Sequence, residues 1–341
     1  MPGRINRVLS AILQKDWGYL LINSNQRRYL PCMRSTIQKL AFTAAACLLA
    51  IQLAAQKKVC ITIDDVPVVD YGMNTVEDWQ NITDKLLTTC EQKGIPAIGY
   101  VNEGKFHKNG NLDAERAKIL EVWLERGFEL GNHTFSHPNY HKVGLKDFKR
   151  DVIDGERYTK PLLQKYGQEL KYFRHPYLRA GDSKESSEAL EAFLTERGYT
   201  SSPVTLDSDD YLFAQAYARA ARSGDSTRMK LIGETYVQHT EKKLHFYETL
   251  SEAVFERNID HTYLMHANLL NADYLDELAE MFQRNGYEFI SQAEVLKDPA
   301  YSEPMTRFGN WGMSWLYRWA LSRDKGTEVF KQDVELPEIV R

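Results

Sequence analysis

The chain has 341 residues, of which 43% are hydrophobic and 26% are charged, and its formal net charge is −4. This composition is typical of a globular protein that is long enough to bury one large core or two. Because 47 acidic residues outnumber 43 basic ones, no strong positive field is available to attract nucleic acid or an anionic membrane, and we expect neither as a partner.

The first 56 residues differ in pattern from the rest of the chain. A basic stretch begins at Met33, a 14-residue, mostly apolar run spans Leu40–Leu53, and small residues follow it. This order is typical of a secretory signal peptide, and the run is too short to span a membrane comfortably. We expect residues 1–32 to be an upstream extension outside the fold and residues 33–56 to be a signal peptide. Its cleavage would leave an exported protein, periplasmic or extracellular, without stable membrane insertion; a retained membrane anchor is the alternative.

From Lys57 onward, short apolar runs alternate with stretches of helical periodicity. The stretch Thr75–Lys93, for example, carries apolar residues at helical spacing and ends at Gly94. We expect strands near 58–63, 95–101, 128–132, 171–175, 199–206, 262–266 and 287–291. We expect helices at 75–93, 114–126, 147–166, 183–197 and 272–285. This alternation favours an α/β fold with parallel strands and crossover helices, and seven units predict a barrel, or a barrel that lacks a strand, rather than an open sheet.

Two segments fall outside this alternation. Residues 211–245 are longer and more polar than the other connections, and we expect them to form an inserted helical loop. The last residues, 299–341, are rich in aromatic side chains, and we expect them to pack back on the barrel. The main domain is therefore expected to span residues 57–298.

Residues capable of chemistry follow the predicted strands at the points where those strands end. The adjacent acids Asp64 and Asp65 follow the first strand, and His133 and His137 follow the third. One acid and two imidazoles provide three ligands for a divalent metal with an open coordination position, which is typical of a hydrolytic site. Because neighbouring side chains on a strand point to opposite faces, we expect the second acid to be left over as a candidate base.

Five short motifs occur in order between residues 57 and 298. They are Thr62-Ile-Asp-Asp65, His133-Thr-Phe-Ser-His137, Arg174-His-Pro-Tyr177, Asp207-Ser-Asp-Asp-Tyr211 and Leu264-Met-His266. Each motif alone is weak, but the five in this order and spacing resemble the polysaccharide deacetylase (NodB-homology) family, also called carbohydrate esterase family four. The resemblance implies a distorted (β/α) barrel of about seven parallel strands and an enzyme that removes acetyl groups from a polysaccharide or oligosaccharide.

The resemblance also implies how the first motifs would act. Asp65, His133 and His137 would hold a divalent metal, most often zinc. The ion would polarise the substrate carbonyl and lower the pKa of a water molecule. Asp64 would take the proton from that water as general base, and Arg174 would pair with Asp64 and orient it.

The remaining motifs would complete the reaction. The backbone N–H of Tyr177 would help to hold the oxyanion, as donors of this kind do in acyl transfer. His266 would give a proton to the departing nitrogen as general acid, and Asp210 would tune it. Leu264 would line the pocket for the acetyl methyl group, and Tyr211 would form part of the substrate groove.

The chain departs from the family pattern at a few positions. Val66-Pro67 follows the second acid where the family usually has Gly, Ile63 replaces Phe, and Tyr211 replaces Trp. The ligand set is intact, but the substrate stays open among chitin oligomers, peptidoglycan N-acetylglucosamine and acetylated xylan, and between N- and O-deacetylation. Two other functions stay open: hydrolysis of a small linear or cyclic amide on the same fold, and glycan binding without catalysis. The sequence predicts no oligomeric state.

Overall fold

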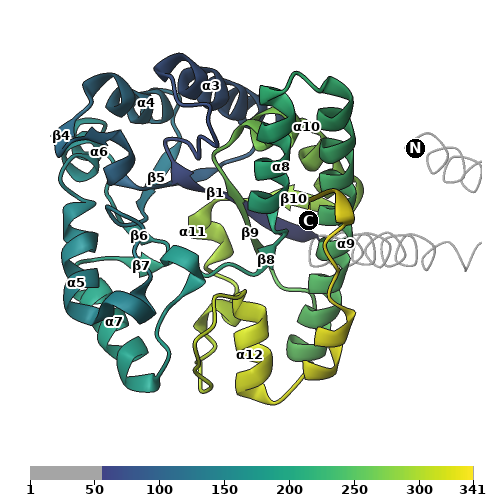
Figure 1. Cartoon of the computed structure of the whole chain (residues 1–341). Coiled ribbons are helices and arrows are strands. Elements are labelled where there is room, and N and C mark those ends of the chain that lie inside the picture. The colour runs from purple at the N-terminus through teal and green to yellow at the C-terminus, as the bar shows by residue number, and fades with distance from the viewer. Residues whose placement is uncertain (1–55, 341) are drawn as a thin grey trace, which may run out of the picture. The chain divides into compact units, whose positions relative to one another are not determined.

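A single sheet of parallel strands lies at the centre of the computed structural model, which describes residues 56–340 (Figure 1). The strands follow the order β7-β6-β5-β2-β1-β9-β8, and β10 pairs with β1 beside this path. They are β1 (Lys57–Val66), β2 (Ile98–Val101), β5 (Glu129–Asn132), β6 (Tyr172–Phe173), β7 (Thr200–Ser201), β8 (Leu206–Asp207), β9 (His261–His266) and β10 (Tyr287–Phe289). β1 therefore pairs with three other strands.

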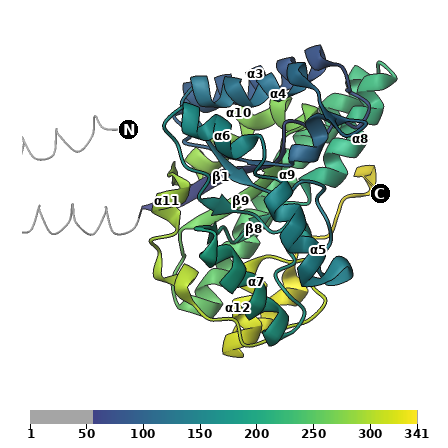
Figure 2. The same cartoon turned by 90° about the vertical axis from the view of Figure 1, so that its left-hand side faces the viewer.

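The sheet curls into a barrel that stays open on one side. Among the described residues no ladder joins β7 to β8, so these strands are the two ends of the path. Helices surround the strands on the outside (Figures 1 and 2). The predicted distorted barrel of about seven parallel strands is confirmed.

Helices connect the strands in the crossover pattern that parallel pairing requires. The helix α3 (Val76–Lys93) begins and ends as the sequence predicts. Thr75 and Asp78 form a capping box at its start, and Gly94 ends it with φ 66°. The helices are α3 (Val76–Lys93), α4 (Ala114–Glu125), α5 (Tyr140–Asp154), α6 (Thr159–Lys165), α7 (Lys184–Glu196), α8 (Asp210–Arg222), α9 (Ser226–Phe255), α10 (Leu269–Arg284), α11 (Gln292–Val295) and α12 (Trp315–Arg323). Short 3₁₀ turns and a small hairpin of β3 (His107–Lys108) and β4 (Asn111–Leu112) complete the fold.

The single strand predicted at 199–206 is wrong, because the structure has two short strands there. β7 pairs with β6, whereas β8 pairs with β9 at the other end of the path. Pro203 lies between them and has no N–H to donate to a ladder. The chain therefore crosses the open side of the barrel at this point.

Two helical predictions also need correction. Residues 211–245 are not an inserted loop; they form most of α8 and α9, and the buried side chains of α9 include Ile232, Tyr236 and Leu244. Polar residues on the solvent side of these helices obscure the apolar face in the sequence. The helix predicted at 147–166 is divided into α5 and α6 at Gly155, where a Cβ atom would collide with the backbone of Thr134.

The last part of the chain packs on the barrel through α12. Leu316 and Trp319 are buried, and the ring of Trp319 meets those of Phe255 and Tyr301 edge-on. The predictions for residues 1–32 and for the signal peptide at 33–56 lie outside the described residues, except for Gln56. In the part of the chain that is described, no helix is both long and apolar enough to cross a bilayer.

Candidate active site

The two acids at the end of β1 face the same side of the sheet. Asp65 has a left-handed backbone, with φ 65°, and the register of β1 against β2 shifts between Ile63 and Val66. This is a β-bulge, which adds a residue and redirects the side chain. Asp64 Oδ2 and Asp65 Oδ1 consequently lie 3.7 and 3.8 Å from one atom, Nε2 of His133. The expectation that the two acids point to opposite faces is therefore wrong, because strand alternation fails at a bulge.

Asp65, His133 and His137 bring three donor atoms together. Their ligand atoms all lie within 4.8 Å of one another, and Asp65 Oδ1 is 3.8 Å from Nε2 of each imidazole. Nδ1 of His133 donates to the carbonyl oxygen of Arg174 at 2.8 Å, which leaves Nε2 with its lone pair. Asp65 Oδ1 is buried and has no hydrogen-bond partner among the described residues. These unpaired oxygen and nitrogen donors fit a divalent cation.

The charges around these donors favour the forms that bind a cation. Burial lowers the pKa of both His133 and His137, so both imidazoles are neutral near pH 7. Burial alone would raise the pKa of Asp65, but the ammonium of Lys105, 3.5 Å from Asp65 Oδ2, is the largest opposing charge, and the pKa lies below its usual range.

Lys105 is a site residue that the sequence analysis missed. Its Nζ also donates to the carbonyl oxygens of Asp65 and Val68, at 3.1 and 3.2 Å. Lys105 therefore ties down the bulged end of β1. It lies shortly after the end of β2, so the rule that chemistry gathers at strand ends could have found it.

Arg174 is fully buried beside Asp64. Its Nη2 donates to Thr62 Oγ1 at 2.8 Å, and the guanidinium group lies 4.7 Å from the centroid of the Tyr100 ring. Its Nε is 3.7 Å from Asp64 Oδ1, which is an ion-pair distance and too long for a hydrogen bond. Burial raises the pKa of Asp64 to about 6 although Arg174 opposes the shift. A carboxylate with this pKa is suited to accept a proton near neutral pH.

His266 forms a tightly bonded pair with Asp210. Its Nδ1 donates to Asp210 Oδ1 at 2.7 Å, and its backbone N–H donates to Oδ2 at 2.9 Å. Asn271, a second residue that the sequence analysis missed, donates to Asp210 Oδ2 at 2.6 Å and to the carbonyl oxygen of His266 at 2.8 Å. Burial opposes a charge on His266, but Asp210 outweighs burial and raises the pKa of His266 to about 10. His266 is therefore protonated at neutral pH.

The candidate base and the candidate acid lie on neighbouring strands. Asp64 is the register partner of His266 across β1 and β9. Near pH 7 the first is mostly ionised and the second carries its proton, since their pKa values are about 6 and about 10. Two groups in opposite protonation states beside one cluster of metal-ligand atoms are the arrangement that acid–base hydrolysis requires.

The other predicted residues lie around this centre. Tyr177 is 54% exposed, and its ring centroid lies 4.4 Å from that of His137. Tyr211 is 47% exposed, and its carbonyl oxygen accepts from the hydroxyl of Tyr71 at 3.2 Å. Leu264 is buried in β9, two residues before His266. Two exposed aromatic rings and a buried leucine therefore accompany the polar groups.

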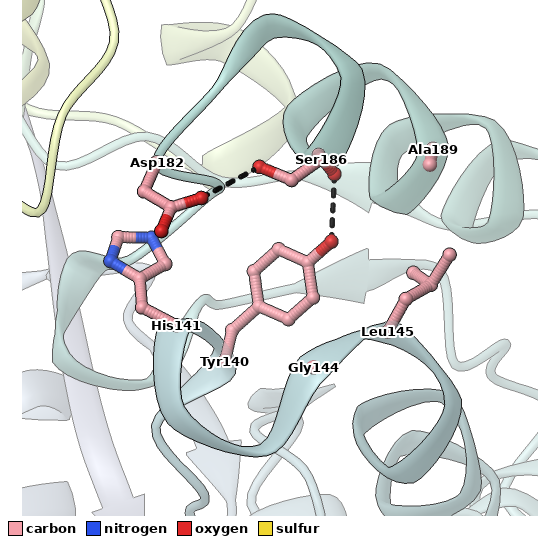
Figure 3. A pocket seen from close by; sticks show the side chains of 7 residues that line it. All are labelled: Tyr140, His141, Gly144, Leu145, Asp182, Ser186 and Ala189. Carbon is pink, nitrogen blue, oxygen red and sulfur yellow. Dashed lines mark hydrogen bonds between the residues drawn. The ribbon is translucent and has the colours of Figure 1, made fainter.

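A separate small cavity lies between α5 and α7 (Figure 3). Its polar groups bond to one another: the Tyr140 hydroxyl donates to the Ser186 carbonyl oxygen at 2.7 Å, and Ser186 Oγ donates to Asp182 Oδ1 at 3.1 Å. His141 accepts from the Gly181 N–H through Nε2, and its Nδ1 is 3.1 Å from Asn310 Oδ1. Both ring nitrogens of His141 are occupied, so it does not join the metal-ligand atoms of His133 and His137.

Part of the chain is similar to known protein sequences. Residues 53–193 match the family model described as polysaccharide deacetylase. A curated peptidoglycan-N-acetylglucosamine deacetylase from Bacillus cereus is 27% identical over 120 residues, which are 35% of this chain and 36% of that protein. The match spans about a third of that relative's length. The matched stretch contains the first three of the five motifs, and over this stretch the resemblance to the polysaccharide deacetylase family is confirmed.

Solved structures with a related arrangement are distant in sequence. A chitin deacetylase from the fungal pathogen Colletotrichum lindemuthianum is 19% identical, with a TM-score of 0.48 over 71% of this chain and 88% of that one. A family 4 carbohydrate esterase from Streptomyces lividans, in complex with acetate, is 18% identical, with a TM-score of 0.45 over 70% and 94% of the two chains. The barrel assignment rests on the strand order of this chain.

Proposed function

We propose that this chain, whose residues 53–193 form part of a polysaccharide deacetylase domain, is an exported, metal-dependent hydrolase that removes acetyl groups from an N-acetylated glycan. One observation carries the proposal: a base candidate, three metal-ligand atoms and a protonated acid candidate converge where β1, β5 and β9 end. A glycan-binding protein without catalysis would have no use for Asp64 and His266 in opposite protonation states.

Asp65, His133 and His137 are the residues that would hold the metal, which we propose to be zinc. When bound there, a divalent cation supplies Lewis acidity toward a carbonyl oxygen and toward water. Asp64 does the proton transfer: its carboxylate, with Arg174 3.7 Å away, accepts the proton of the attacking water. Thr62 and Tyr100 hold Arg174 in place, so its positive charge stays beside the carboxylate.

His266 supplies the proton that the leaving amine needs. An amine leaves readily only when protonated, and the pKa of about 10 keeps the proton on His266 until the carbon–nitrogen bond breaks. Asp210 fixes the ring, so that Nδ1 carries the proton shared with Asp210 and Nε2 carries the proton that is delivered. This division of labour between Asp64 and His266 is the chemical core of the proposal.

The turn at Tyr177 would stabilise the oxyanion. Its ring packs against that of His137, one of the three metal-ligand residues. Removal of one oxyanion-hole donor costs about 10²–10³ in kcat in enzymes where this has been measured. The exposed rings of Tyr177 and Tyr211 offer flat apolar faces, which suit the faces of sugar rings.

An acetate-release panel tests the proposal. Purified protein is incubated with chitin oligomers, peptidoglycan and acetylated xylan, and zinc and other metals are measured on the same sample. We expect acetate from at least one N-acetylated glycan in proportion to bound metal. A metal-loaded protein that releases no acetate from any of them would contradict the proposal. Hydrolysis of small linear or cyclic amides alone would favour the amide hydrolase.

Export is part of the proposal and has its own test. The basic stretch, apolar run and small residues at 33–56 support it. N-terminal sequencing of the native protein should give a mature chain that starts near Gln56. A mature chain that begins before Met33 would contradict both the signal peptide and the upstream extension.

A further inference from the structure

A buried arginine near the end of the chain makes an unusual set of contacts. Arg318, on α12, is 1% exposed. Its guanidinium group donates to three backbone carbonyl oxygens: Leu178 at 2.5 Å, Trp311 at 3.2 Å and Met313 at 3.3 Å. Within residues 56–340 no carboxylate forms an ion pair with it. The guanidinium group also lies 4.8 Å from the centroid of the Trp315 ring. A buried cation that donates to three main-chain carbonyl oxygens holds that backbone in place.

The backbone that Arg318 holds is strained. Tyr177 and Leu178 both have left-handed backbones, with φ 55° and 53°. Residues other than glycine disfavour left-handed backbone angles. Two left-handed residues in succession therefore persist only where the surrounding structure holds them. The turn itself contributes two hydrogen bonds, from the N–H of Leu178 to His175 and from the N–H of Arg179 to Pro176. Arg318 adds a third restraint, from outside the turn.

The loop before α12 lies directly on the same turn. A Cβ atom at Gly312 would collide with the carbonyl oxygen of Tyr177, so the two backbones approach as closely as they can. Asn310 Oδ1 accepts from Nη1 of Arg179 at 2.9 Å. Residues 309–318 lie beyond residues 53–193, the part that matches the family model. They nevertheless cover the turn that follows β6.

We infer that residues 309–318 belong to the catalytic machinery, with Arg318 as a positioning residue that keeps the Tyr177 N–H aimed at the oxyanion. The inference rests on the proposed function for the role of that N–H. Arginine suits the task because its planar fork reaches several carbonyl oxygens at once, whereas lysine offers a single ammonium group. A segment that served only to cover apolar surface would need neither the buried guanidinium group of Arg318 nor a glycine at position 312.

Kinetics of Arg318→Lys provide the first test. We expect kcat to fall by about tenfold or more, because the oxyanion donor is displaced rather than removed. KM, metal content and the two limbs of the pH profile should stay as in the wild type, since Asp64, His266 and the metal-ligand atoms are untouched. Arg307→Lys is the matched control, because Arg307 lies in the same part of the chain and is 60% exposed. Gly312→Ala, which moves the Tyr177 carbonyl without touching Arg318, should reproduce the loss in kcat.

Hydrogen–deuterium exchange provides a readout that needs no activity. The amides of Leu178 and Arg179 should exchange faster in Arg318→Lys than in Arg307→Lys, because the turn opens more often. Wild-type kcat and wild-type exchange in both Arg318→Lys and Gly312→Ala would overturn the inference. If the wild-type protein releases no acetate at all, the proposed function fails, while the exchange rates still decide whether Arg318 holds the turn.

Discussion

The two sides of the candidate active site differ in how completely their polar groups are paired. On the metal side, Asp65 Oδ1 lies 3.8 Å from two imidazole nitrogens and has no hydrogen-bond partner among the described residues. On the acid side, Asp210 accepts three hydrogen bonds of 2.6–2.9 Å from His266 and Asn271. The acid side is thus complete as it stands, whereas the metal side has donors separated by the width of an ion.

This difference indicates where the site depends on a ligand. Buried polar groups without partners raise the free energy of the folded state, so a bound cation stabilises the metal side more than the acid side. The cation does not stabilise the acid side directly, because the hydrogen bonds of Asp210 are already formed. Substitutions on the two sides should therefore differ in their effect on metal content, and the first three predictions use that difference.

The largest effect is expected from His133→Ala. It removes a donor of the metal side, so bound metal and acetate release should fall together. Loss of an outer-shell partner costs about 10–100-fold in metal affinity, and loss of a ligand should cost more. Metal analysis and acetate assays check this, with His245→Ala as the control because that imidazole is exposed and pairs with Glu248. Full metal content in His133→Ala would remove His133 from the ligand set.

Asp64→Asn should lower turnover without removing the metal. The substitution deletes the proton acceptor and leaves the three donors in place, so we expect a loss of about 10²–10⁴ in kcat. Asp70→Asn, in the exposed loop after β1, is the control. Equal loss of metal in Asp64→Asn and His133→Ala would show that the two acids of β1 do not have separate roles.

Asp210→Asn should shift the pH profile rather than the metal content. The carboxylate raises the pKa of His266 to about 10, and the acid works only while protonated. Without that charge the pKa falls toward its ordinary value, so the high-pH limb of kcat/KM should move down by about one pH unit or more. Asn271→Ala should shift the same limb less, since the carboxylate remains. If the high-pH limb of kcat/KM does not move in Asp210→Asn, His266 is not the general acid.

The smallest effect concerns a histidine outside the site. His261 is buried between Asn258 and Thr205, and burial lowers its pKa to about 4. Between about pH 6.5 and 4 the unfolded chain binds a proton that the native state does not, so the free energy of unfolding falls as the pH falls, by about 1.4 kcal/mol per pH unit. Urea unfolding of His261→Gln at pH 7 and pH 5 should show a shallower pH dependence with unchanged activity at pH 7. An identical dependence would show that His261 is not the group that titrates.

The sequence predicted the fold where the pattern is local. The strand at 58–63 and the helix at 75–93 follow from apolar spacing and end signals, and the order of such units gave the barrel. The break at Pro203 and the long helix α9 were missed, because both depend on packing against segments far away in the chain.

In the candidate active site, the motifs predicted that Asp65, His133 and His137 lie together, and the structure places their ligand atoms within 4.8 Å of one another. The bulge at Asp65 could not be predicted from the sequence, since its left-handed backbone is held by Lys105 from another strand end. Asn271 and Arg318 were missed for a related reason: they act through backbone or through another side chain and belong to none of the five motifs.

The position of β1 has a consequence for how this protein would fail on heating. The same ten residues supply both acids and pair with three neighbouring strands. Segments that open first are those with few buried contacts, and β1 is the opposite of such a segment. Thermal inactivation and global melting should therefore coincide, with no intermediate temperature at which an intact barrel carries a disassembled catalytic centre.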